Sequence, residues 1–190
     1  MYARGFKSWC EKIALEKRKL LGLYNFSPLD PYKLAKSLDV KIWKPEVVPD
    51  LEPDVLQTLL DDSDSWSAFT ICFLGQKVIM LNSSQHGARQ ASNITHEVAH
   101  IIIGHNPARG YVSADGHLVV SDYSKEQEEE ANWLSGCLLL PREALIYIKR
   151  QRLSDEVVQK KYGVSEQMLQ YRKRVSGIEN QFSKARKNFR

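Results

Sequence analysis

The pattern of apolar and polar residues first predicts a basic amphipathic helix over residues 3–22. Apolar residues recur near one face at helical spacing, and Lys and Arg lie opposite them. The expected apolar face consists of Phe6, Trp9, Ile13 and Leu20. Gly22 marks the expected end of this helix.

A short helix–strand unit and a hairpin are predicted next. Pro31 suits the first position of a helix, PYKLAKSLD, which leads into a strand, VKIW. Residues 45–65 contain three prolines and seven acids, and we expect an irregular surface connection there. Two strands, WSAFTICFL and KVIMLN, follow on either side of Gly75-Gln76 and are typical of a hairpin.

The second half of the chain has mainly helical periodicity. Residues 86–103 carry Ile94, Val98, Ile101 and Ile102 at helical spacing, so we predict a helix that ends at Gly104. Residues 105–123 are polar and predict a loop. Further helices are expected from a capping box at Ser124 and Gln127 through Leu139, and then over 142–150, 154–162 and 165–175, followed by a frayed tail over 177–190. A small sheet followed by helices indicates an α+β fold.

Composition places the chain among ordinary folded proteins. Its 190 residues fit one globular domain, 43% are hydrophobic, and 26% are charged. No apolar run approaches the roughly 18 residues that span a bilayer, and the N-terminal segment lacks the pattern of a signal peptide. The three cysteines are widely spaced and odd in number, which suits a reducing compartment. We therefore expect a cytoplasmic protein.

Charge is distributed unevenly along the chain. Residues 1–22 have a net charge of +4, residues 23–141 of −8, and residues 142–190 of +8. Basic ends around an acidic middle favour either packing of the ends on the middle or contact with an anionic partner.

The sequence His96-Glu97-Val98-Ala99-His100 carries the clearest chemistry. Two histidines four residues apart lie on one face of a helix, so both imidazoles can reach one ion. Zinc prefers such nitrogen ligands, at about 2.0–2.1 Å. Glu97 lies beside them and can act as the base that takes a proton from a metal-activated water. The pattern predicts a metal-dependent hydrolase.

A third protein ligand is expected from the helix that follows. A third histidine six residues after His100 is absent, because that position is Asn106, and His105 reads better as a polar residue at the helix end. Glu128 can supply a carboxylate, and Asn132, four residues on, can hydrogen-bond a ligand histidine. Glu129 and Glu130 read as acids that favour the start of a helix. Two histidines and one carboxylate favour Zn²⁺, with Mn²⁺ as the alternative.

These paired motifs resemble the ImmA/IrrE family of metallopeptidases. The matching residues are HEVAHIIIGH at 96–105 and E-x-x-A-N-x(8)-P at 128–141, and the similarity covers roughly residues 27–175. Two positions depart from the family pattern: ARQASNIT precedes the first motif, and Leu140 replaces a usual Met.

The resemblance implies a small gluzincin-like fold, in which a short β-sheet packs on the HExxH helix and a second ligand helix, with a helical C-terminal extension. It implies a metal held by His96, His100 and Glu128, with Glu97 as the catalytic base. It further implies cleavage of a helix-turn-helix (Xre-like) repressor that controls a mobile element, such as a phage, or a stress response. We divide the chain into a basic N-terminal helix (1–22), a metallopeptidase core (23–150) and a helical C-terminal segment (151–190).

The expected reaction needs a bound peptide and a second electrophile. We expect the peptide to lie extended along the edge of the strand at 77–82. Tyr111, His117 and Tyr123 are candidates for stabilising the transition state, and the sequence does not choose among them.

Two other functions compete with peptide cleavage. Residues 153–175 read as helix, turn at Gly163-Val164-Ser165 and basic helix, which resembles a DNA-binding helix-turn-helix. A helical pair that packs on the core explains the same pattern. The basic helix over 1–22 could alternatively be the interaction surface of a toxin-like partner protein.

Overall fold

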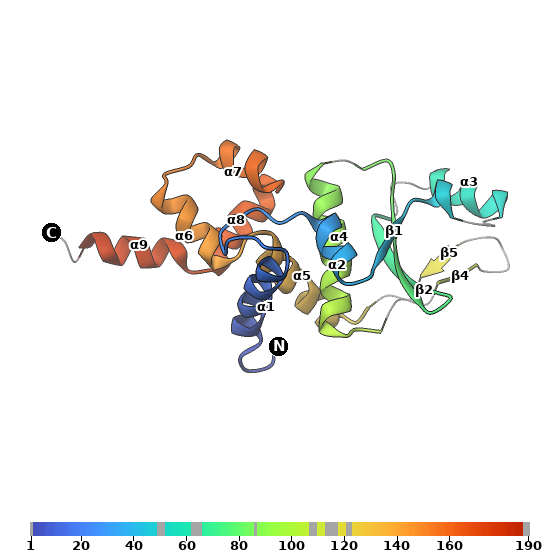
Figure 1. The fold of residues 1–190 in the computed structure, drawn as a ribbon, viewed down its shortest axis with the longest axis horizontal. Helices are drawn as coiled ribbons and strands as arrows, with labels where there is room; N and C mark the ends of the chain where they lie inside the picture. The colour runs from blue at the N-terminus through green and yellow to red at the C-terminus, as the bar shows by residue number, and fades with distance from the viewer. Residues whose placement is uncertain are drawn as a thin grey trace. The chain divides into compact units, whose positions relative to one another are not determined.

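The computed structural model describes residues 2–48, 52–61, 66–85, 87–106, 110–112, 118–120 and 123–187. It divides into two compact units (Figure 1). The sheet unit comprises Met1–Tyr2 and Asp30–Asn132, and the helical unit comprises Ala3–Leu29 and Trp133–Arg190. Among the helices in these described ranges, none is long and apolar enough to cross a membrane.

The sheet unit begins with the predicted helix–strand pair. Helix α2 (Pro31–Ser37) starts at Asp30, whose side chain accepts hydrogen bonds from the backbone N–H groups of Tyr32 and Lys33. Strand β1 (Lys41–Trp43) follows. A 3₁₀ turn, η1 (Pro45–Val47), and helix α3 (Pro53–Asp61) then lie where the sequence predicted irregular structure. That prediction was wrong because proline at a first helical turn is compatible with a helix, and α3 buries Leu59.

A three-stranded sheet has the order β1-β3-β2. Strands β2 (Ala68–Phe73) and β3 (Gln76–Leu81) form the predicted antiparallel hairpin, and β3 pairs in parallel with β1. Positive φ angles at Leu74 and Gly75 make the turn one residue earlier than the sequence predicted. The expectation of a substrate along the 77–82 strand is wrong, because β3 is central and both of its edges are already paired.

Helix α4 (Ala88–Ile103) packs against β2, β3 and α2. Ile94, Val98 and Ala99 of α4 are completely buried. On β3, Ile79 and Leu81 are also completely buried, and they lie on the same face of the sheet as Thr70, which contacts α4. Each buried Ile, Val or Leu side chain contributes about 1.5–3 kcal/mol by leaving water. The helix therefore has one fixed face toward the sheet.

The chain between α4 and the next helix contains a small hairpin. Strands β4 (Gly110–Val112) and β5 (Leu118–Val120) pair antiparallel where the sequence predicted a loop. Helix α5 (Lys125–Leu139) then begins at the predicted capping box. The backbone N–H of Ser124 donates to Gln127 Oε1, and the backbone N–H of Gln127 donates to Ser124 Oγ.

The helical unit contains the predicted α1 (Phe6–Leu20), α6 (Arg142–Arg150), α7 (Asp155–Tyr162) and α8 (Glu166–Val175). A further helix, α9 (Ile178–Lys187), replaces the expected frayed tail, and Ile178 is buried. In α1 the buried residues are Cys10, Ala14 and Arg18, whereas Trp9 and Leu20 are exposed. The predicted apolar face was therefore wrong at Trp9 and Leu20, whereas Phe6 and Ile13 are partly buried. The small side chains of Cys10 and Ala14 are the fully buried apolar residues of this helix.

Candidate metal centre

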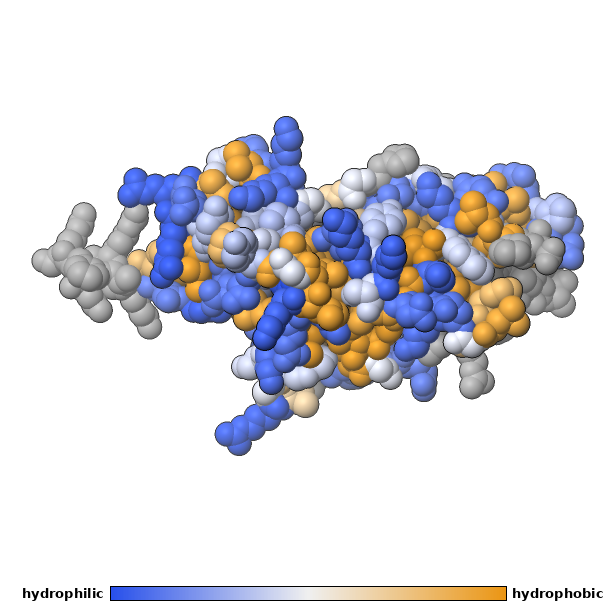
Figure 2. Space-filling model, in the orientation of Figure 1, coloured by the Kyte–Doolittle hydropathy of each residue, from blue (hydrophilic) through white to orange (hydrophobic). Residues whose placement is uncertain are grey.

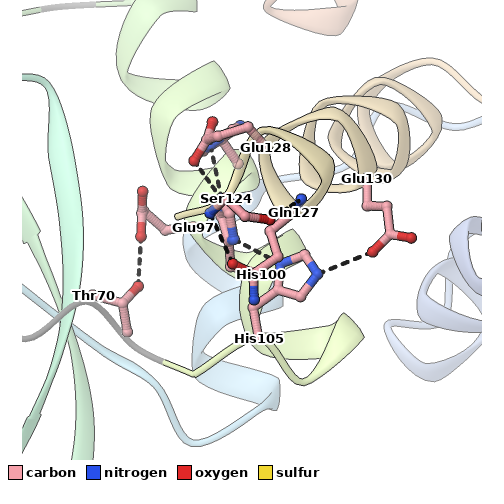
Figure 3. Close-up of polar contacts among 9 residues, drawn as sticks. Thr70, Glu97, His100, His105, Ser124, Gln127, Glu128 and Glu130 are labelled. Carbon is pink, nitrogen blue, oxygen red and sulfur yellow. Dashed lines mark hydrogen bonds and ion pairs between the residues drawn. The ribbon is translucent and has the colours of Figure 1, made fainter. Parts of the chain in front are cut away.

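Three side chains of the sheet unit converge between α4 and α5. His96 and His100 lie one turn apart on α4, and Glu128 lies in the first turn of α5. Their nearest ligand atoms all lie within 4.8 Å of one another. Figure 3 shows the Glu128 carboxylate pointing from α5 toward the His100 ring. The structure thus brings together the three residues that the sequence predicted as ligands.

The dimensions of this cluster fit a tetrahedral cation. The two Nε2 atoms of His96 and His100 are 3.0 Å apart. The carboxylate oxygens of Glu128 lie 3.3 Å from His96 Nε2 and 3.4 Å from His100 Nε2. Zinc with bonds of about 2.0–2.1 Å would hold its ligand atoms about 3.3 Å apart. Two imidazoles and one carboxylate leave one position of such a site for water or substrate.

Electrostatics favour a neutral, metal-binding form of His100. Burial is the largest influence and lowers the pKa of His100, and the neighbouring His96 lowers it further. Burial also lowers the pKa of His96, but the hydrogen bond to Glu128 and the charge of Glu97 outweigh it and raise that pKa overall. The Asn132 side chain is the smallest of the influences that raise the pKa of His96, and its role as a hydrogen-bond partner of a ligand histidine stays a prediction.

Glu97 is held against the sheet rather than among the ligand atoms. Glu97 is 5% exposed, and Thr70 Oγ1 on β2 donates a 2.7 Å hydrogen bond to Glu97 Oε2 (Figure 3). Burial raises the pKa of Glu97 to about 7, although the hydrogen bonds from the Thr70 hydroxyl and backbone N–H oppose this shift. A carboxylate whose pKa lies near neutrality can both accept and return a proton.

Among the residues that the structure describes, only one of the three candidates for transition-state stabilisation lies beside the site. Tyr123 stacks on His100, with ring centroids 3.6 Å apart and an interplanar angle of 16°. Tyr111 lies in β4, whose backbone alone is described, and His117 lies outside the described residues. The structure therefore brings Tyr123 to the site, and the role of all three in the reaction stays a prediction.

Sequence reasoning missed two residues of the cluster. His105 Nδ1 lies 2.8 Å from His100 Nδ1, and His105 Nε2 lies 3.1 Å from Glu130 Oε2. The sequence predicted Glu130 only as an acid that favours the start of a helix, but its carboxylate also pairs with His105. The available signal was Gly104, which turns the chain directly after α4 and returns His105 toward the helix end.

The helical unit contains the elements of the predicted helix-turn-helix, but two of their basic side chains form ion pairs within the unit. Helices α7 and α8 are joined at Gly163, which has a φ of 63°. In α8, Arg172 is fully buried and pairs with Glu11, and Lys173 pairs with Asp155. Two of the three basic side chains in the last turn of α8 are therefore not free to contact DNA.

The comparison with protein families gives one match. Residues 51–174 match the Peptidase_M78 family, described as the IrrE N-terminal-like domain, and this segment is about two thirds of the chain. No match was found among curated proteins or among solved structures. The matched segment contains the HExxH helix, the ligand helix and the sheet hairpin. The chain therefore belongs to the ImmA/IrrE family of metallopeptidases.

Proposed function

We propose that the protein is a zinc-dependent endopeptidase, gluzincin-like in its ligand set, that cleaves a helix-turn-helix (Xre-like) transcriptional repressor. The observation that carries the chemistry is the convergence of His96, His100 and Glu128 beside a buried Glu97. A bound zinc ion would polarise the scissile carbonyl and lower the pKa of the attacking water. Mn²⁺ is the alternative ion.

Glu97 is the proposed base of the reaction. Its carboxylate accepts a proton from the attacking water and returns it to the amine that leaves. The hydrogen bond from Thr70 fixes one carboxylate oxygen, so the other oxygen is oriented for this transfer. Tyr123, which stacks on His100, is the proposed stabiliser of the oxyanion among the three candidates.

The repressor substrate is supported by membership of the family and by the place of the hydrolytic site beside a sheet edge. Cleavage of the repressor would derepress a mobile-element or stress-response operon. The test is co-expression with a helix-turn-helix repressor encoded beside this gene. Loss of intact repressor with the wild type but not with Glu97→Gln supports the proposal, and equal loss with both contradicts it.

Glu97→Gln is a sharp control because it keeps the size of the side chain and all three proposed ligands. We expect a metal content equal to that of the wild type and a loss of cleavage of about 10²- to 10⁴-fold, the range for a general base. Elemental analysis and a peptide cleavage assay measure the two effects on the same sample.

The free edge of β2 is the proposed position of the substrate peptide. In the described part of the chain, β2 pairs on one side only, with β3. The Phe73–Gln76 pair closes the two-residue turn and is therefore hydrogen-bonded, so the backbone groups of Thr70 and Cys72 point to the free edge. A peptide paired there would pass beside the base.

Cys72→Pro tests this position. Proline removes the outward N–H at Cys72 without removing a bond to β3, and edge strands accept proline. We expect a higher KM and an unchanged metal content, whereas Cys72→Ala should behave as the wild type. An unchanged KM in Cys72→Pro would contradict the proposed position.

Contact of the basic helical unit with nucleic acid is the second candidate function. This unit has 19 Lys and Arg against 7 Asp and Glu, a net charge of +12, whereas the sheet unit has a net charge of −8. On the face shown in Figure 2, hydrophilic side chains project from the helical unit with apolar residues exposed between them. Tyr24, Phe26 and Tyr147 stack in a row, with Lys161 Nζ over the last ring, and such rings can stack on bases.

The salt dependence of binding tests this candidate. Neutralised phosphates release counterions, so the affinity for duplex or single-stranded DNA should fall steeply as the salt concentration rises. A Tyr24→Ala variant should weaken binding to single strands while leaving the charge intact. Absence of binding at low salt would remove the candidate and leave the peptidase proposal untouched.

A further inference from the structure

After the end of α4, His105 contacts the ligand His100, and the hydrolytic mechanism gives His105 no role. The sequence His100-Ile-Ile-Ile-Gly104-His105 ends the helix with Gly104 in the left-handed conformation, at a φ of 87°. The backbone N–H groups of Gly104 and His105 both donate to the His100 carbonyl, at 3.1 and 3.0 Å. This turn brings the residue after glycine back over the side chain of the residue five positions earlier.

The turn therefore places the two imidazoles in contact. His105 Nδ1 lies 2.8 Å from His100 Nδ1, on the side of the His100 ring opposite its metal-facing Nε2. The other nitrogen of His105, Nε2, lies 3.1 Å from Glu130 Oε2 on α5. Only 7% of the His105 side chain is exposed, so water competes little for these contacts.

The chemistry of imidazole fixes the direction of each hydrogen bond. A His100 ring that binds a cation through Nε2 must carry its proton on Nδ1. That Nδ1–H can donate only to an unprotonated nitrogen, so His105 Nδ1 must be an acceptor and His105 must carry its proton on Nε2. The Nε2–H of His105 then donates to Glu130, which is a carboxylate and accepts. A cation on His100 Nε2 and the two hydrogen bonds of His105 are consistent with one another only in this arrangement.

We propose that His105 and Glu130 are positioning residues that hold His100 in its Nδ1-protonated, metal-binding tautomer. The inference rests on the proposed metal site, and it adds two residues that act through His100 rather than on the substrate. Tyr123 stacks on the face of the same ring, so His100 is held in its plane by Tyr123 and along its edge by His105. Outer partners of this kind typically contribute about 10- to 100-fold in metal affinity.

The tautomers can be measured directly in the metal-free protein. Nitrogen-15 NMR of the imidazoles, at a pH where the rings are neutral, should show His100 protonated at Nδ1 and His105 protonated at Nε2. His105→Phe should remove the preference at His100 while filling the same space. A His100 protonated at Nε2, or a His105 protonated at Nδ1, would overturn the proposal.

Metal affinity provides the second readout, through variants of Glu130. Glu130→Met removes the acceptor at similar length and should weaken zinc binding by about tenfold or more, measured by competition with a chromogenic chelator. Glu130→Gln keeps an oxygen acceptor and should restore most of the affinity. Glu126→Met, an exposed glutamate in the first turn of the same helix, is the matched control and should bind zinc as the wild type does.

The results separate this inference from the proposed function. Equal zinc affinities for the wild type, Glu130→Met and His105→Phe would overturn the role of these residues and leave the metal site standing. A wild-type protein that binds no zinc would overturn both. A purely structural role for Glu130 would lower stability equally in the Met and Gln variants, and it would not separate their zinc affinities.

Discussion

At the scale of single residues, the base and the ligands are held by contacts of different origin. Thr70 comes from β2 and reaches Glu97 across the interface between the sheet and α4. Thr70 is 1% exposed, so the hydroxyl and the carboxylate meet in a poorly solvated environment. A hydrogen bond to a buried charged group is worth about 1.5–3 kcal/mol. The orientation of Glu97 therefore depends on one hydroxyl.

Thr70→Val removes that hydroxyl and keeps the shape of the side chain. We expect the cleavage rate to fall by about 10- to 100-fold, the equivalent of the lost hydrogen bond, with unchanged zinc affinity. Thr70→Ser should recover most of the rate. A Thr70→Val enzyme as active as the wild type would show that Glu97 is oriented without this contact.

At the scale of elements, local signals predicted most helices and long-range contacts decided what was missed. Two local signals act within a few residues: the capping box at Ser124 and Gln127, and the glycine at 104. The start of α5 and the end of α4 could therefore be predicted. The central place of β3 depends on its pairing with β1, which no local pattern encodes. The partnership of His105 with Glu130, 25 residues apart, was missed for the same reason.

Helix α1 is held in the helical unit by contacts of two of its charged side chains, Glu11 and Arg18. Glu11 accepts a 2.6 Å hydrogen bond from Arg172 Nη2 on α8 and a 2.8 Å hydrogen bond from the Arg142 N–H at the start of α6. Arg18 on the same helix donates to the carbonyls of Ala14, Ser27 and Leu139. These contacts favour packing of residues 3–20 within the helical unit over a free interaction surface.

Glu11→Gln leaves the Arg172 guanidinium buried without a counter-charge. We expect the free energy of unfolding of the helical unit to fall by about 3 kcal/mol, the low end for a broken buried pair because Glu11 is 26% exposed. Glu16→Gln on the same helix breaks an exposed pair with Lys12 and should cost about 0.3–0.5 kcal/mol. Urea unfolding measures both, and equal losses would contradict the buried-pair interpretation.

Gly136 on α5 lies against side chains of α8. A Cβ at this position would lie 2.8 Å from Cδ of the buried Arg172 side chain. Gly136→Ala should therefore displace Arg172 and destabilise the helical unit by about 1–3 kcal/mol, the usual cost of overpacking. Thermal unfolding followed by circular dichroism measures the loss, and a stability equal to the wild type would show that Arg172 moves without cost.

At the scale of the whole molecule, the two units differ in charge and in what stabilises them. The helical unit has a continuous apolar core that runs from Leu139 to Ile178, closed by the Glu11 and Arg18 contacts. The sheet unit has a three-stranded sheet with α4 on it, and it places two histidines and one carboxylate with their ligand atoms 3.0–3.4 Å apart. Stability of the sheet unit should therefore depend on the cation, because a shared ion removes the need to pack these polar groups against one another.

Metal removal tests this dependence. A ligand that binds only the folded state stabilises it by about 2.7 kcal/mol when its free concentration is 100 times Kd. Hydrogen exchange should show this gain on adding zinc in α4 and in residues 125–132, which carry the proposed ligands. Helices α7 and α8 lie in the other unit and should keep the same protection with and without zinc. Equal gains in both sets of helices would mean that zinc binds elsewhere or acts on the whole chain, and no gain in α4 would contradict the metal site itself.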